Sequence, residues 1–147
     1  MKLNKIIKKE NIFFNTNGIN NKEKAIEFLI QKVSQNNNLN FKSIRKHVFD
    51  REERLSTGIG GRIAIPHARI ENLKNFHIGI LISEKDIDFD SLDNNPVNII
   101  ALLLSPKNKV KKHISLISKL SYLLTEKEIY KKILNSKKSS NIIKLLK

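Results

Sequence analysis

Residues 97–105, VNIIALLLS, limit the possible folds of this chain more than any other segment does. The run is almost continuously apolar, and its length suits one β-strand. A strand of this kind has apolar side chains on both faces, so other elements must cover it on both sides. Such coverage is typical of layered proteins in which helices flank a central sheet.

Further strands and helices are predicted on either side of this segment. Residues 62–65 and 76–83 have strand-like sequences, and the alternation in 87–90 indicates a short edge strand. Helical spacing of apolar residues predicts helices at 21–35, 41–54, 109–124, 126–134 and 141–146. Because helices flank a block of strands, we expect an α/β fold of three layers, with helices on both sides of a central mixed β-sheet.

The chain shows no internal repeat and no long linker rich in glycine, serine or proline, so we expect residues 1–147 to form a single domain. The polar stretch 35–40 is typical of a loop between two helices. The longest apolar run, 99–104, is too short to cross a bilayer, and the basic N-terminus lacks an apolar stretch of signal-peptide length. Cysteine is absent, which excludes disulfides, thiolate catalysis and cysteine zinc sites. We therefore expect a cytoplasmic protein.

The formal net charge of +14 raises the possibility of a nucleic-acid partner. The basic residues are spread along the chain, however, and lysine is accompanied by abundant asparagine and isoleucine, which also have AT-rich codons. Genome composition is therefore the simpler explanation of much of the charge. The sequence has no helix-turn-helix signal, no aromatic-rich basic strand and no helix with a basic and an aromatic face. Nucleic acids and membrane surfaces are consequently disfavoured as partners, while acidic proteins remain an alternative.

Residues 56–69, STGIGGRIAIPHAR, differ in composition from the rest of the chain. Pro66 has no N–H and a fixed φ, so it ends strand pairing and leaves His67 at the carboxyl end of a strand, where ligands commonly bind in α/β sheets. Upstream, two hydroxyls and several unhindered backbone N–H groups are suited to an anion such as phosphate. The candidate phosphate-binding residues are Ser56, Thr57, Gly58, Gly60, Gly61 and Arg62. The glycine spacing matches neither common nucleotide-binding loop, and a glycine turn with a buried histidine at its end remains the alternative.

Two residues outside this segment are expected to complete a site. Arg51 falls on the buried stripe of the helix 41–54, at the end of that helix, so its guanidinium either reaches solvent or points into a site. His113 lies in the first turn of the helix that follows the long apolar strand, where free N–H groups favour anions. Two imidazoles, an arginine and a glycine loop predict phosphoryl chemistry without a metal, in which one neutral imidazole attacks phosphorus and the other donates to a phosphoryl oxygen. His47 and His77 are expected to be structural or surface residues.

Several of these segments together resemble one protein family. The segment REERLSTGIGGRIAIPHA, residues 51–68, is similar to the active-site segment of the type 2 enzyme IIA domains of the bacterial phosphotransferase system. This class includes the mannitol and fructose proteins and their nitrogen-regulatory paralogue. Residues 22–30, 89–106 and 113–124 resemble the first long helix, the later strands and a later helix of that family. Within it, STGIG and FDSLDNNPV are most similar to the nitrogen-regulatory branch.

The resemblance implies a mannitol-type enzyme IIA fold and a phosphocarrier function. It implies that His67 accepts a phosphoryl group from the phosphohistidine of the histidine phosphocarrier protein, HPr, or of its nitrogen-branch counterpart. It places Arg51 and His113 in the active site and matches Ser56 and Thr57 to the polar residues of the loop. It implies no metal and no cofactor. In the regulatory branch, phosphate on the histidine changes which proteins bind, including regulated transporters and sensor kinases. In the sugar-transport alternative, the phosphate moves on to a IIB domain.

The loop departs from the family pattern at one point. The family has Gly-Asn-Gly before the strand, whereas this chain has Gly60-Gly61-Arg62. A β-carbon at position 62 is unfavourable if that residue needs a positive φ. Either Gly61 takes over the permissive conformation, or Arg62 adds a phosphate contact or shapes the surface that the partner meets.

Overall fold

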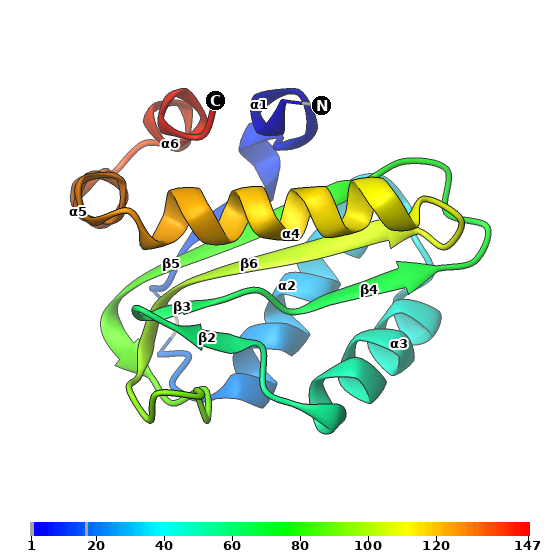
Figure 1. Cartoon of the computed structure of the whole chain (residues 1–147), viewed down its shortest axis with the longest axis horizontal. Coiled ribbons are helices and arrows are strands. Elements are labelled where there is room, and N and C mark those ends of the chain that lie inside the picture. The colour runs from blue at the N-terminus through cyan, green and yellow to red at the C-terminus, as the bar shows by residue number, and fades with distance from the viewer. Residues whose placement is uncertain (1, 17) are drawn as a thin grey trace.

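A central mixed sheet organises the computed structural model, which describes residues 2–16 and 18–147 (Figure 1). Within these residues, six strands form the sheet in the order β1-β5-β6-β3-β2, and β4 also pairs with β6. The strands are β1 (Ile12–Phe14), β2 (Gly58–Gly60), β3 (Ile63–Ala64), β4 (His67–Ile70), β5 (His77–Ile87) and β6 (Val97–Pro106). β6 is antiparallel to β5 and parallel to β3 and β4, so the sheet is mixed as expected.

The apolar strand β6 is covered on both faces. Ile99, Ala101 and Leu103 pack into one hydrophobic core, whereas the alternate residues Ile100, Leu102 and Leu104 pack into a second core on the other face. Every residue of β6 is buried. The expectation drawn from residues 97–105 is confirmed, and with it the three-layer α/β arrangement.

Two groups of helices provide this coverage. The core on one face contains residues of α2 (Lys22–Asn37) and α3 (Phe41–Arg54). The core on the other face contains residues of α1 (Leu3–Ile6), α4 (Val110–Thr125), α5 (Lys127–Asn135) and α6 (Ser139–Leu145). The 3-10 helix η1 (Lys9–Asn11) joins α1 to β1. Figure 1 shows α4 crossing in front of the sheet and α2 behind it.

Asparagines set the limits of the first two long helices. The side chains of Asn21 and Asn40 accept hydrogen bonds from the N–H groups three residues on, which begins α2 and α3. Asn38 has a left-handed φ of 54°, which ends α2. The polar stretch 35–40 therefore contributes the last turn of one helix and the start of the next.

The strands differ from the sequence predictions in their extent. The predicted edge strand 87–90 is wrong as a separate element, because β5 continues to Ile87 across an irregularity in its pairing with β6. β3 covers only part of the predicted strand 62–65, since Pro66 lacks an N–H and Arg62 has a φ of 67°. The short strands β1, β2 and β4 were not predicted, because segments of three or four residues carry too little alternation to be recognised.

The unusual loop residue has a specific set of contacts. Gly61 and Arg62 both have positive φ, at 64° and 67°, so the glycine does not relieve position 62 of this conformation. The Arg62 guanidinium donates to Asp86 at 3.0 Å, near the end of β5, and to Asn98 at 3.2 Å, near the start of β6. These contacts anchor a conformation that costs a residue with a β-carbon about 1–2 kcal/mol.

No helix within residues 2–16 and 18–147 has the length and apolar character needed to span a bilayer.

Candidate active site

A pocket of about 340 Å³ lies where α3, β4 and the first turn of α4 meet. Its lining residues are His47, Asp50, Arg51, Arg54, His67, Ala68, Arg69 and His113. The three residues expected to carry the chemistry, Arg51, His67 and His113, therefore come together in one cavity. A larger cavity of about 700 Å³ lies at the other edge of the sheet, but its described lining holds no histidine.

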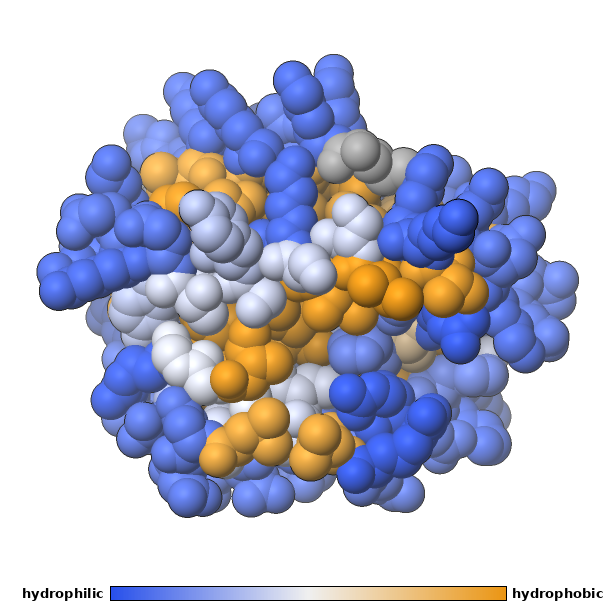
Figure 2. All heavy atoms as spheres, viewed as in Figure 1, coloured by the Kyte–Doolittle hydropathy of each residue, from blue (hydrophilic) through white to orange (hydrophobic). Residues whose placement is uncertain are grey.

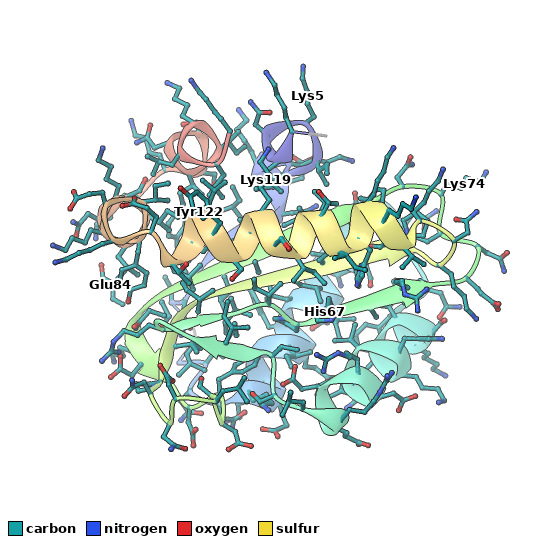
Figure 3. The ribbon with its side chains drawn as sticks, viewed as in Figure 1. Lys5, His67, Lys74, Glu84, Lys119 and Tyr122 are labelled. Carbon is teal, nitrogen blue, oxygen red and sulfur yellow. The ribbon has the colours of Figure 1, made fainter. Side chains whose placement is uncertain are left out.

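Strand pairing places the two histidines next to each other. β4 runs parallel to β6, and His67, which is labelled in Figure 3, is in register with Leu103, shortly before β6 ends at Pro106. The chain then turns, with the N–H of Lys109 donating to the carbonyl of Pro106, and α4 starts back across the sheet. His113 in its first turn consequently faces β4, and the two imidazole centroids are 5.3 Å apart with an interplanar angle of 62°.

The ring of His67 has one nitrogen occupied and one available. Its Nδ1 lies 2.8 Å from the carbonyl oxygen of Ile65. A carbonyl oxygen only accepts hydrogen bonds, so Nδ1 carries the proton and the lone pair of the neutral ring is on Nε2. Burial lowers the pKa of His67, and the positive charges of Arg51 and Arg54 lower it further, against the opposing effects of the Ile65 hydrogen bond and Glu52. The imidazole is therefore neutral at neutral pH and can act as a nucleophile.

His113 is more deeply enclosed. Only 6% of the residue is exposed, and its Nδ1 lies 2.7 Å from the hydroxyl oxygen of Ser105, which is itself fully buried. Burial lowers the pKa of His113 to about 4, with smaller contributions from His67 and Arg69. A neutral ring that accepts the Ser105 hydroxyl proton at Nδ1 presents its Nε2–H as a donor.

Positive side chains surround the two imidazoles. The Arg51 guanidinium is oriented by a 2.8 Å hydrogen bond from Nη1 to the carbonyl of Leu55, just beyond the end of α3. Arg54 also lines the pocket from α3, and Arg69 lines it from β4. With both histidines neutral, the arginines give the pocket a positive potential suited to an anion.

The sequence predictions missed several residues of this pocket. His47 was expected to be structural or on the surface; it is exposed and also lines the pocket from α3. Helical spacing was the available signal, because residues three and four positions from Arg51, here Arg54 and His47, share a helix face with it. His77 is buried in β5 and does not line the pocket, and burial lowers its pKa.

The glycine-rich loop makes other contacts. None of Ser56, Thr57, Gly58, Gly60, Gly61 and Arg62 lines the 340 Å³ pocket. The Ser56 hydroxyl donates to the carbonyl of Phe89, and the Gly61 N–H donates to the Asp93 carboxylate. Gly58 packs so closely against Ser91 that a β-carbon would not fit. These two donors of the loop thus have acceptors within the protein.

Apolar side chains are exposed beside the pocket. Leu55, which follows α3, is 57% exposed, and Val110 and Ile114 on the first turns of α4 are 42% and 58% exposed. Figure 2 shows an apolar band across this face of the molecule, bordered by hydrophilic surface. Exposed apolar residues that flank a polar pocket are typical of a surface that meets another protein.

Comparison with known proteins identifies the family. Residues 5–147 match the family described as "Phosphoenolpyruvate-dependent sugar phosphotransferase system, EIIA 2". The nitrogen regulatory protein of Escherichia coli (strain K12) is 31% identical over 113 residues, which are 76% of this chain and 69% of that protein. The fructose-specific EIIABC component of Bacillus subtilis (strain 168) is 30% identical over 147 residues, which are 99% of this chain but only 23% of that protein.

Solved structures share the fold. The nitrogen regulatory protein IIA-Ntr of Neisseria meningitidis superimposes with a TM-score of 0.91 at 24% identity, covering 98% of each chain. The mannitol IIA protein of Escherichia coli superimposes with a TM-score of 0.79 at 19% identity, covering 94% of this chain and 96% of that one. With a family match over nearly its whole length and the same arrangement of helices around a mixed sheet, the chain belongs to the type 2 EIIA family of the phosphoenolpyruvate-dependent phosphotransferase system.

Proposed function

We propose that this protein is a phosphocarrier that accepts a phosphoryl group on Nε2 of His67 from a phosphohistidine of HPr or of its nitrogen-branch counterpart. The observation that carries the proposal is the state of the His67 ring. Its Nδ1 proton is hydrogen-bonded to the Ile65 carbonyl, which leaves the lone pair on Nε2. The ring lines a pocket together with His113 and Arg51. A neutral, oriented imidazole is the nucleophile that transfer between histidines requires.

The transfer is a single in-line displacement at phosphorus. The Nε2 lone pair of His67 forms the new N–P bond while the N–P bond of the donor breaks, and the donor ring recovers its lone pair. The proton on Nδ1 of His67 stays in its hydrogen bond to Ile65. Donor and acceptor are both imidazoles, so the bond broken and the bond formed are of the same kind and the transfer is reversible.

Two neighbouring groups stabilise the phosphoryl oxygens, which carry most of the charge in a loose transition state. Arg51 supplies a permanent positive charge from the end of α3. His113, hydrogen-bonded to Ser105, supplies an N–H without adding charge, because its low pKa keeps the ring neutral. Donors aimed at developing negative charge in a partly dry pocket are an effective form of catalysis. The donor protein docks over the exposed apolar residues beside the pocket, Leu55, Val110 and Ile114.

We further propose that the phosphate has a regulatory role in a nitrogen or potassium branch. The similarity to nitrogen regulatory proteins in sequence and in fold supports this assignment, as does the STGIG loop. The alternative is a sugar-specific role with transfer to a IIB domain. It is supported by the fructose-specific relative and by the similar mannitol IIA protein, which has been solved in complex with a phosphorylated IIB protein. In either case residues 1–147 act as one domain in the cytoplasm.

The first experiment tests phosphoryl acceptance. The protein is incubated with enzyme I, HPr and labelled phosphoenolpyruvate, and the label is located by mass spectrometry. Wild type is expected to take up one phosphoryl group, His67→Ala none, and the control His77→Gln as much as wild type, because His77 lies outside the pocket. Labelling of His67→Ala at another histidine would refute the assignment.

A second experiment separates the two roles. Phosphorylated protein is mixed with the IIB proteins of the same organism, and loss of label from His67 is followed with time. The regulatory role predicts that the label stays, whereas rapid transfer to a IIB protein would establish the sugar-specific role.

A further inference from the structure

A buried carboxylate next to the active site has no place in the mechanism above. Glu52 lies in the last turn of α3, directly after Arg51, but it points inward and is only 5% exposed. Three donors surround it. Nζ of Lys22 is 3.0 Å from Oε2, the Thr57 N–H donates to the same oxygen at 2.8 Å, and the Thr57 hydroxyl donates to Oε1. A buried carboxylate with so many donors holds the groups around it in one arrangement.

The contacts of Thr57 extend from Glu52 toward the nucleophile. The carbonyl of Thr57 accepts a 3.0 Å hydrogen bond from the N–H of Ile65. The carbonyl of the same Ile65 accepts the hydrogen bond from Nδ1 of His67. Glu52, Thr57, Ile65 and His67 therefore form a continuous series of hydrogen bonds, and three of these four residues are buried.

Each link in the series fixes the next. Two hydrogen bonds to one carboxylate hold Thr57, so its carbonyl is fixed against α3. That carbonyl holds the N–H of Ile65, which lies just after β3. Because Pro66 follows, the ψ of Ile65 is restricted to extended values, so the Ile65 carbonyl one peptide further on is held as well. The orientation of the Ile65 carbonyl then decides which ring nitrogen of His67 holds the proton.

We infer that Glu52 is a positioning residue for His67, acting through Thr57 and Ile65 to hold the Nδ1-protonated tautomer and so keep Nε2 free for phosphoryl transfer. This inference rests on the proposed function for its purpose, but the series of hydrogen bonds exists without it. It also gives the Thr57 hydroxyl a different role from the phosphate contact expected from the sequence, since that hydroxyl donates to Glu52. The charge of Glu52 also acts on His67, because it raises the pKa of that imidazole and so opposes the lowering by Arg51 and Arg54.

The test measures the tautomer of His67 directly, in full-length protein labelled with ¹⁵N-histidine. Long-range proton–nitrogen spectra distinguish a protonated from an unprotonated ring nitrogen in each histidine. Thr57→Val removes the hydroxyl at nearly constant shape and leaves the Lys22–Glu52 ion pair in place, whereas Thr57→Ser keeps the hydroxyl. Glu52→Gln removes the charge. Val33→Ala serves as a stability control, because Val33 is fully buried in α2 and has no part in the series.

Wild type and Thr57→Ser are expected to show His67 protonated almost entirely at Nδ1. Thr57→Val and Glu52→Gln are expected to show a mixture of tautomers, and Glu52→Gln in addition a lower pKa of His67. Their rates of phosphoryl acceptance should fall by about tenfold, the factor that corresponds to losing one hydrogen bond of typical net strength. Val33→Ala should lose stability while its tautomer and its rate, corrected for folded protein, stay as in wild type.

The inference is overturned if Thr57→Val and Glu52→Gln keep the wild-type tautomer while losing stability as Val33→Ala does, since Glu52 would then only support the fold. It is equally overturned if wild-type His67 is protonated at Nε2. The spectra need no phosphoryl donor, so they separate the two proposals. A wild-type protein with the expected tautomers that never accepts phosphate would refute the proposed function and leave the positioning role of Glu52 intact.

Discussion

Phosphorylation of His67 should raise the pKa of His113, because it places negative charge close to that imidazole. The imidazole centroids are 5.3 Å apart, and the pKa of His113 in the unmodified protein is about 4. With an effective dielectric constant of about 20, a unit charge at this separation contributes about 3 kcal/mol, or roughly 2 pKa units. A phosphoryl group partly neutralised by Arg51 retains about one negative charge, since its full charge is about −1.5 to −2. The pKa of His113 should therefore rise from about 4 to about 6.

The assay is a pH titration of the histidine ring signals by NMR between about pH 5 and 8, with and without phosphate on His67. In the unmodified protein the His113 signals should stay those of a neutral ring throughout. In the phosphorylated protein they should titrate with a midpoint near 6. His77 is the internal control, because it lies in β5 outside the pocket and its pKa should not move. If His113 remains neutral down to about pH 5 after phosphorylation, the phosphoryl group does not sit against it, and its assigned role as a donor is wrong.

Three further predictions concern stability. The pKa of His113 is about 6.5 in the unfolded chain and about 4 in the folded protein, so the unfolded state binds the proton first as the pH falls. The free energy of unfolding therefore decreases on acidification. In urea denaturation, wild type should lose about 2 kcal/mol more than His113→Gln between about pH 6.5 and 5. A β-carbon at Gly79 would collide with Cγ2 of Val33, so Gly79→Ala should lower the free energy of unfolding by about 1–3 kcal/mol. Adding Val33→Ala removes the colliding methyl group and should recover part of that loss. If the losses of the two substitutions simply add, the packing argument is wrong. Because Arg62 has a positive φ and its ion pair is half exposed, Arg62→Gly should be at least as stable as wild type in thermal unfolding, with Arg62→Ala about 1 kcal/mol below Arg62→Gly. The reverse order of glycine and alanine would show that φ does not limit this position.

The central histidines could be predicted because local chemistry marks them. Pro66 interrupts the sheet directly before His67, and His113 follows the end of the apolar strand by a short turn. Arg51 could be predicted from its place on the buried stripe of a helix. Each of these residues is recognisable from its immediate neighbours, and the structure brings all three to one pocket.

The role of the glycine-rich loop could not be predicted in the same way. Hydroxyl and N–H groups show where donors are available, but the acceptor that takes each of them depends on residues distant in sequence. Ser56 donates to Phe89, and Gly61 to Asp93. Glu52 could not be recognised either, because in sequence it is one of several charged residues at the end of a helix and only packing makes it buried.

The distribution of charge also depends on the tertiary structure. Lysines are spread along the sequence, but residues 2–10 and 107–147 carry many of them and only Glu10, Glu126 and Glu128 as acidic residues. α1, α4, α5 and α6 lie in these ranges and contribute to one hydrophobic core, so both ends of the chain build the same basic layer. Figure 3 shows Lys5 and Lys119 on neighbouring parts of this layer.

The layers and the starts of the first two long helices follow from local features of the sequence. A strand that is apolar on both faces needs cover on both sides, and asparagines and a proline define helix starts and a break in the sheet, because these effects act between neighbouring residues. The register of β4 on β6, and the turn that brings His113 of α4 onto Ser105, depend instead on contacts between distant parts of the chain. Those long-range pairings bring two neutral imidazoles to 5.3 Å and leave one lone pair free, since distance and tautomer depend on groups that only the folded chain brings together.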